Sequence, residues 1–224
     1  MSKRVLVTGG SRGIGKSIVE IYRAKGYEVD APPRKDLDLS KDESIEAFLK
    51  NIKSSSRGYD IIVNDAGVNL INEIDKVVTN DLEEMIRVNL LAPIKLLRGL
   101  VPYMKEKEFG RIVNIGSIWG VVSKPGRSIY SATKHGIHGI TMTLSLELAP
   151  YGILVNTVAP GQTMTELTMR NNPGRGIRKM EKDIPLGRLA QPTEIAKAVY
   201  WLGSEENTYI TGQQIVVDGG LTVK

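Results

Sequence analysis

Short apolar runs alternate with amphipathic segments along this 224-residue chain. Six of these runs are rich in β-branched residues and predict strands. Most are apolar nearly throughout, which is typical of strands buried on both faces of a parallel sheet. The runs are Val5 to Thr8, Tyr27 to Ala31, Asp60 to Val63, Arg111 to Ile115, Ile153 to Val158 and Gln214 to Val217. Their alternation with helical segments predicts an α/β fold with a doubly wound, Rossmann-type parallel sheet.

Apolar residues at helical spacing occupy the segments between these strands. One set begins at Ile14, and another begins at Ile45 after Ser40 and Glu43, which have capping-box form. Longer helices are predicted over Asp81 to Met104, Tyr130 to Ala149 and Pro192 to Leu202. The stretch from Pro32 to Leu39 leaves no room for a crossover helix, so we expect the second βα unit to be abbreviated.

The length and composition indicate a single domain over residues 1–224. The chain is 41% hydrophobic and contains no linker, internal repeat or low-complexity tract. It starts Met1-Ser2-Lys3-Arg4 and continues directly into a strand, and no apolar stretch approaches the length needed to span a bilayer. We therefore expect a cytoplasmic protein that does not associate with membranes.

Two classes of chemistry are disfavoured by composition. The chain has no cysteine, and its two histidines, His135 and His138, have no nearby set of carboxylates, so no metal site is expected. The net charge of +5 would permit nucleic-acid binding. However, the basic residues are scattered and no aromatic residues are interleaved with them. A basic enzyme with an anionic cofactor is the simpler interpretation.

The most informative motif is the glycine-rich turn from Thr8 to Gly15, directly after the first predicted strand. Closely spaced glycines that open a helix allow a pyrophosphate to approach the free N–H groups of the helix N-terminus. The turn therefore predicts a dinucleotide site. An ordinary strand-to-helix junction is the alternative, because the spacing Gly9-x-x-x-Gly13-x-Gly15 is not the commonest dinucleotide fingerprint.

A second motif supplies candidate acid–base chemistry. Ser117 ends the fourth predicted strand, and Tyr130 and Lys134 lie four residues apart, on one face of a predicted helix. An ammonium beside a phenol favours the phenolate, which makes proton exchange with an alcohol or carbonyl oxygen feasible. Taken alone, the Tyr–Lys pair is also compatible with an ordinary helix surface.

Combined with the glycine turn, the pattern resembles the short-chain dehydrogenase/reductase (SDR) family over essentially the whole chain. The matching segments are Thr8 to Gly15, Asn64-Asp65-Ala66-Gly67, Val88-Asn89, Ile115-Gly116-Ser117, Tyr130 to Lys134, Pro160-Gly161 and Ile210 to Gly220. The general likeness is to 3-oxoacyl-acyl-carrier-protein reductase-type members. Those members carry basic residues where this chain has Glu108 and Tyr151, which weakens the carrier-protein interpretation.

The resemblance implies roles for individual residues. Tyr130 would be the general acid/base, Lys134 would lower its pKa and hold the nicotinamide ribose, Ser117 would polarise the substrate oxygen, and Asn89 would anchor a water in the proton relay. The implied cofactor-binding residues are Gly9, Ser11, Arg12, Gly13, Ile14, Gly15, Asp38, Leu39, Asn64, Ala66, Gly67, Tyr130, Lys134, Pro160 and Gly161, and Asp65 departs from a commoner Asn. Residues 162–184 would form a substrate lid.

The end of the second strand indicates a preference for NADP(H). Pro33 stands about where NAD enzymes place an acid on the ribose 2′-hydroxyl, and Arg34, Lys35 and Arg12 supply cations for a 2′-phosphate. NAD(H) remains possible, because a shift of register could bring Asp30 to the ribose.

The lid contains several Arg and Lys residues, which suits either an anionic substrate or a solvated loop.

The sequence therefore predicts an NADP(H)-preferring oxidoreductase that interconverts a small-molecule carbonyl and its alcohol. A cofactor-sensing regulatory protein without turnover is the alternative.

The long helices Asp81 to Met104 and Tyr130 to Ala149 carry more apolar residues than one face requires. In family members such helices pair across a two-fold axis, so we expect a homo-oligomer, a tetramer, with residues 214–224 in a second interface.

Overall fold

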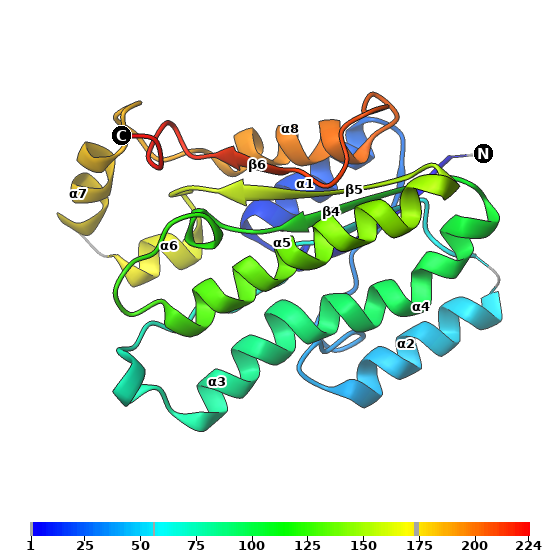
Figure 1. Cartoon of the computed structure of the whole chain (residues 1–224), viewed down its shortest axis with the longest axis horizontal. Helices are drawn as coiled ribbons and strands as arrows, with labels where there is room; N and C mark the ends of the chain where they lie inside the picture. Colours follow the sequence, from blue (N-terminus) through cyan, green and yellow to red (C-terminus); the bar gives the residue numbers. More distant parts are fainter. Residues whose placement is uncertain (1, 56, 173–174) are drawn as a thin grey trace.

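Six parallel strands form one sheet at the centre of the computed structural model, which describes residues 2–55, 57–172 and 175–224 (Figure 1). The strand order is β2-β1-β3-β4-β5-β6. The bounds are β1 Arg4–Thr8, β2 Glu28–Asp30, β3 Ile61–Asn64, β4 Gly110–Ile115, β5 Ile153–Pro160 and β6 Gln214–Val217. These strands confirm the predicted doubly wound parallel sheet, with β2 shorter than expected.

Helices cover both faces of the sheet (Figure 1). One face carries α1 (Gly13–Ala24) and α8 (Pro192–Gly203), and the other carries α2 (Asp42–Ser55), α4 (Ala92–Glu106) and α5 (Ser128–Leu148). The remaining elements are α3 (Thr79–Ile86), α6 (Glu166–Asn171), α7 (Arg175–Asp183), a π-helical turn η2 (Arg87–Leu91), and the short 3-10 turns η1 (Ile74–Lys76), η3 (Ile118–Gly120) and η4 (Ala149–Tyr151). Within the described residues, no helix is both long and apolar enough to cross a membrane.

Two hydrophobic cores lie on opposite faces of the sheet because successive strand side chains point to opposite sides. In β1, Leu6 packs with α2 and α4, whereas Val5 and Val7 pack with α1 and α8. All three side chains are fully buried. This explains the continuous apolar run in β1, since both of its faces are covered.

The second βα unit is abbreviated, as the sequence predicted. Doubly wound sheets commonly have the strand order 3-2-1-4-5-6. Here the strand that would stand outside β2 is missing, and the chain passes from β2 through a loop into α2 and then back to β3. Strand β2 is therefore an edge strand.

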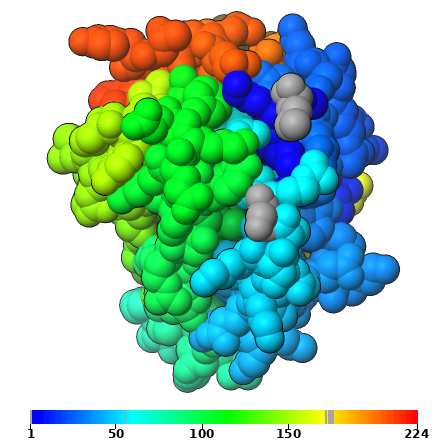
Figure 2. Space-filling model, turned by 90° about the vertical axis from the view of Figure 1, so that its right-hand side faces the viewer, coloured from blue at the N-terminus to red at the C-terminus, as the bar shows by residue number. Residues whose placement is uncertain are grey.

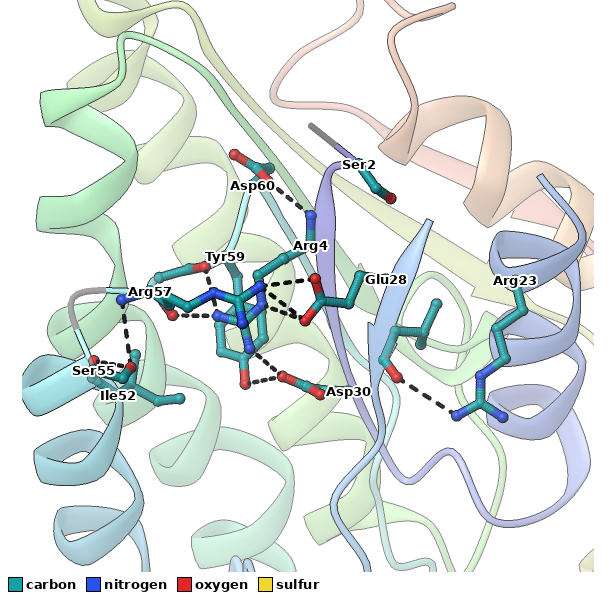
Figure 3. Close-up of polar contacts among 12 residues, drawn as sticks. Ser2, Arg4, Arg23, Glu28, Asp30, Ile52, Ser55, Arg57, Tyr59 and Asp60 are labelled. Carbon is teal, nitrogen blue, oxygen red and sulfur yellow. Dashed lines mark hydrogen bonds and ion pairs between the residues drawn. The ribbon is translucent and has the colours of Figure 1, made fainter. Parts of the chain in front are cut away.

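An ion-pair network joins this edge strand to β1 and to the segment before β3 (Figure 3). Arg4 on β1 pairs with Asp30 at 2.5 Å and with Glu28 at 3.2 Å, and Arg57 also pairs with Glu28. The Tyr59 hydroxyl donates to the same Asp30 oxygen at 2.8 Å. Charged side chains on an edge strand disfavour pairing with another chain. The network thus occupies a position where an unprotected edge would favour aggregation.

Two local predictions are corrected. The expected single helix from Asp81 to Met104 is interrupted by the π-helical turn η2, which lies between α3 and α4. The expected capping box at Ser40 does not form, because α2 begins at Asp42 and the Ser40 hydroxyl donates instead to Asp38. Both departures reposition residues that face the candidate site described below.

The contact between α1 and α8 places a glycine against a buried phenol. Tyr22 packs edge-to-face against Tyr27 and Tyr200 with ring centroids 5.2 and 5.4 Å apart. Its hydroxyl is buried and has no hydrogen-bond partner among the described residues. A Cβ on Gly203 would overlap that hydroxyl oxygen. Gly203 therefore accommodates the Tyr22 hydroxyl.

We predict that Gly203→Ala destabilises the protein by about 1 to 3 kcal/mol, the usual cost of overpacking a core. Tyr22→Phe should leave stability unchanged or raise it, because it removes a buried hydroxyl without a partner. In the Tyr22→Phe background, Gly203→Ala should destabilise less than in the native protein, with a remaining cost set by the Val113 Cγ2 atom, which would lie 3.2 Å from the added Cβ. Urea unfolding of the native protein, the two single variants and the double variant measures the four free energies of unfolding in this cycle. Additive effects of the two substitutions would contradict the account.

Candidate active site

A cleft of about 430 Å³ lies at the carboxyl ends of the strands. In Figure 1 this is the end of the sheet near α6 and α7, and Figure 2 views the opposite end, where the N-terminus lies. The predicted site residues that line the cleft are Gly9, Ser11, Arg12, Gly13, Ile14, Arg34, Asp38, Leu39, Ala66, Gly67, Ser117, Tyr130, Lys134, Pro160 and Gly161. Open α/β sheets bind ligands at this edge, outside the carboxyl ends of their strands.

The glycine turn presents a free helix N-terminus to the cleft. Arg12, the residue before α1, has an extended backbone, and its side chain does not cap the helix. Gly9 has φ +74°, and a Cβ there would lie 2.8 Å from the Ala66 Cα, so the turn packs directly on the loop after β3. Uncapped N–H groups and the helix dipole favour an anion here.

Asn64 does not line the cleft and lies in the sheet instead. Its side-chain amide donates to Asn114 Oδ1 at 2.8 Å, and Asn114 donates in turn to Thr141 of α5 at 2.9 Å. Thr141 is hydrogen-bonded to Thr157 at 2.8 Å. The structure thus places Asn64 in a row of buried polar side chains across β3, β4 and β5, and this row reaches α5.

The Ser–Tyr–Lys group comes together at one end of the cleft. Lys134 is 4% exposed, and its ammonium donates to the Ile115 carbonyl at 2.7 Å. The same nitrogen lies 5.6 Å from the centroid of the Tyr130 ring. The Ser117 hydroxyl accepts a hydrogen bond from the Trp119 N–H at 3.2 Å.

Asn89 lies behind this group, inside the π-helical turn η2. Its side chain exchanges two hydrogen bonds of 2.8 Å with the backbone N–H and carbonyl of Val68. It also donates to Thr133 of α5 at 3.3 Å. Turns of π-helix are rare and frequently occur at functional sites, so the placement of Asn89 in one supports a functional role for this segment. The side chain ties η2 to α5 and to the loop after β3.

The pKa values of Tyr130, Lys134 and Asp65, which all line the cleft, are shifted. Burial raises the pKa of Tyr130, and the Ser117 hydroxyl and the Arg127 guanidinium offset part of this increase. Burial lowers the pKa of Lys134 to about 8, and Asp65 opposes this change. Burial raises the pKa of Asp65 to about 7, against the effects of Lys134 and the Gly15 N–H. Arg127 is thus a cation that lowers the Tyr130 pKa, and the corresponding effect expected of Lys134 stays a prediction.

At the other end of the cleft, Arg34 and Asp38 lie together. Arg34 Nε is 3.3 Å from Asp38 Oδ2, and the Arg34 side chain is 73% exposed. A hydrogen bond from the Ser40 hydroxyl is the main cause that lowers the pKa of Asp38. Neither Lys35 nor Asp30 is among the residues that line the cleft. Asp30 is held by Arg4 and Tyr59, so the shifted register that would bring it to a ribose does not occur (Figure 3).

Several polar residues of the cleft were not assigned to the site from the sequence, and Arg127, Asn69 and Asp65 are three of them. Arg127 and Asn69 line the cleft and are hydrogen-bonded to each other. Arg127 lies three residues before Tyr130, and this spacing near the start of a helix was an available signal. Asp65 lies beneath the glycine turn, where a Cβ on Gly15 would be 2.5 Å from its Oδ2 atom. Across the described residues, no group of three or more His, Asp or Glu side chains could hold a metal ion.

Comparisons with known proteins agree with this architecture. A family model described as enoyl-(acyl carrier protein) reductase matches residues 24–222. The 3-oxoacyl-acyl-carrier-protein reductase FabG of Vibrio cholerae serotype O1 is 35% identical over 98% of this chain and 97% of its own length. The structure is similar to 4-hydroxyisoleucine dehydrogenase complexed with NADH (TM-score 0.94, 27% identity, all of both chains). It is also similar to ElxO with NADP bound (TM-score 0.91, 30% identity, all of both chains).

We predict that Asp65 makes dinucleotide binding pH-dependent. Since its pKa is raised to about 7, Asp65 is neutral below that pH and ionised above it. The ionised carboxylate would repel a pyrophosphate at the N-terminus of α1. The dissociation constant for NADH should therefore rise above pH 7, by at most about tenfold per pH unit, the limit for uptake of one proton.

The matched control is Asp65→Asn, which keeps the shape of the side chain and cannot ionise. Titrations of both proteins with NADH between pH 5.5 and 7.5 should show the ratio of native to variant dissociation constants increasing with pH. A ratio that stays constant over this range would show that Asp65 does not face the bound dinucleotide.

Proposed function

Since this chain belongs to the SDR family, we propose that it is an NADP(H)-dependent oxidoreductase that interconverts a small-molecule carbonyl and its alcohol by hydride transfer. The observation that carries this proposal is the convergence of Ser117, Tyr130 and Lys134 at one end of the cleft, beyond a free helix N-terminus. The dinucleotide, when bound, supplies or accepts the hydride. The side chains of this chain bind and orient the substrate and the cofactor, and they transfer the proton.

Tyr130 is the general acid/base of the proposed reaction. Its raised pKa keeps the hydroxyl protonated at neutral pH, which is the form needed to donate a proton to a carbonyl oxygen. Ser117 hydrogen-bonds the same oxygen, and Lys134 binds the nicotinamide ribose from its position near Tyr130. Asn89 holds the water that returns the proton. Alcohol oxidation uses the same groups in reverse, with Tyr130 accepting the proton.

The surrounding segments complete the proposed domain. Residues 1–224 act as one NAD(P)-binding unit, with residues 162–184 as a lid over the substrate end. Residues 1, 56, 173 and 174 of these ranges lie outside the described part of the chain. Gln162, Thr163 and Met180 of that segment line the cleft, which supports this assignment. A cofactor sensor without turnover is the rival function. It has no need for Tyr130, Ser117 and Lys134 to converge at one end of the cleft, and this disfavours it.

We predict that Tyr130→Phe abolishes turnover, because it removes the acidic oxygen while keeping the ring. NADPH binding should change less than about threefold, an energy below that of one hydrogen bond. A panel of ketones and alcohols, read by NADPH absorbance, measures the activity. Tyr209→Phe is the matched control, since Tyr209 is 94% exposed and does not line the cleft. Substantial activity in the Tyr130→Phe protein would exclude Tyr130 as the acid.

The proposed preference for NADP(H) rests on two cations. Arg12 and Arg34 both line the cleft, at the glycine turn and beyond the end of β2. A 2′-phosphate would receive charge-assisted hydrogen bonds from them that a 2′-hydroxyl cannot match. Arg34 is largely solvent-exposed and, among the described residues, donates to Asp38 and Ser40, so its guanidinium has further donors available for a phosphate.

We predict that Arg34→Ala weakens NADPH binding about tenfold or more and leaves NADH binding nearly unchanged, as expected for loss of a hydrogen bond to a charged group. Lys35→Ala is the matched control, because Lys35 is the adjacent cation and does not line the cleft. Fluorescence titration of the three proteins with both reduced cofactors measures the six dissociation constants. Tighter binding of NADH than NADPH by the native protein would contradict the proposed preference.

We also propose a homotetramer. Leu91, Ile94, Met142 and Leu146 are exposed on η2, α4 and α5, and Leu146 is 78% exposed. Gly139 lies three residues before Met142 on α5, and a Cβ added there would meet nothing within 4 Å. Exposed apolar side chains on neighbouring helices, with a small residue among them, suit a two-fold contact between copies.

Light scattering at micromolar concentration should give about four times the 24.6 kDa chain mass. Leu146→Glu should reduce that mass, because a buried unpaired carboxylate at the contact is unfavourable. Ile74→Glu, at a residue 67% exposed in η1, should leave the mass unchanged. A monomeric native protein would rule out the tetramer.

A further inference from the structure

We infer that Arg127 binds a carboxylate of the substrate, so that the natural substrates are oxo acids and the corresponding hydroxy acids. This inference deepens the proposed function, because it assigns the substrate class of the same site. It depends on the position, burial and partners of one guanidinium.

Arg127 lies at the start of α5, one turn before Tyr130, and its side chain lines the cleft. The guanidinium is partly buried, and burial lowers its pKa. Its side chain makes one hydrogen bond within the described chain, to the neutral Asn69 side chain. No described carboxylate lies within 4 Å of it, although Glu84 and Glu166 also line the cleft. Four of its five N–H donors are therefore available.

The other buried arginines of the structure are compensated. Arg4 pairs with Asp30 and Glu28, and Arg111 donates to the backbone carbonyls of Gly110, Gly152 and Ser204. A cation removed from water without a counter-charge is costly, so such groups are normally paired. Arg127 differs from Arg4 and Arg111 in facing a cleft instead of a protein partner. A ligand anion would supply the missing charge.

The position of Arg127 relative to Tyr130 restricts the substrate. Arg127 lies three residues before Tyr130 at the start of α5 and both line the cleft, and the reacting oxygen of the substrate must face the Tyr130 hydroxyl. The anion therefore lies only a few bonds from the reacting carbon. A planar guanidinium binds a carboxylate through two parallel hydrogen bonds, which fixes the orientation of a short substrate.

The test compares acids with their neutral esters. The probes are 2-oxobutanoate, 3-oxobutanoate and 4-oxopentanoate and the methyl ester of each, assayed with NADPH. Native protein should prefer at least one acid over its ester. Arg127→Gln should lower kcat/KM for that acid about tenfold to a hundredfold and change kcat/KM for the ester less than about threefold, as expected for loss of a charged hydrogen bond. Lys124→Gln, which removes an exposed cation near Trp119, is the control and should change neither.

Equal losses for acid and ester would overturn the inference, because Arg127 would then act only through the pKa of Tyr130. A native protein that does not prefer any of the acids would also overturn it. Calorimetric titration of the same acids into the NADP⁺-loaded protein separates this inference from the proposed function. Arg127-dependent binding of an acid without turnover would contradict the proposed oxidoreductase and support the carboxylate site. Turnover of the esters alone would support the oxidoreductase and contradict the carboxylate site.

Discussion

The position of α5 against the sheet depends on a row of buried hydrogen bonds. Asn64, Asn114 and Thr157 extend from three adjacent strands, and Thr141 of α5 bonds to two of them. Buried polar groups are costly when unpaired, so this row favours one register of α5 over the alternatives that hydrophobic packing alone would allow. Lys134 lies seven residues before Thr141, on the same side of the helix, and donates to β4 at Ile115. The row thereby places Tyr130 and Lys134 at the carboxyl ends of the strands.

The electrostatics of the cleft follow from that placement. Burial disfavours the charged forms of Tyr130, Lys134 and Asp65 together, so each depends on its neighbours for its protonation state. Asp65 and Lys134 stabilise one another's charged forms, and Arg127 lowers the pKa of Tyr130. The pKa values of Lys134 and Asp65 are moved toward neutrality, which suits these two groups to proton exchange, whereas that of Tyr130 is raised further above it. An anion bound in the cleft would change the pKa values of these groups, so their titration also responds to ligand binding.

Patterns that depend on local chain geometry could be predicted from the sequence. The glycine turn, the i to i+4 pair Tyr130 and Lys134, and the shortened unit after β2 all follow from spacing along one segment, and the structure contains them. The π turn at Asn89 could not be predicted, since its side chain contacts Val68 and Thr133 from other segments. The ion pair that holds Asp30 and the burial of Asn64 likewise depend on partners distant in sequence.

Transfer of deuterium from the cofactor tests the central claim most directly. The native protein would be incubated with a ketone panel and NADPH deuterated at one face or the other of the nicotinamide C4. The account predicts an alcohol that carries one deuterium at the carbon formerly bearing the carbonyl oxygen, from one of the two labelled cofactors only. An alcohol without deuterium from either cofactor, or binding of NADPH with no alcohol formed across the panel, would contradict it.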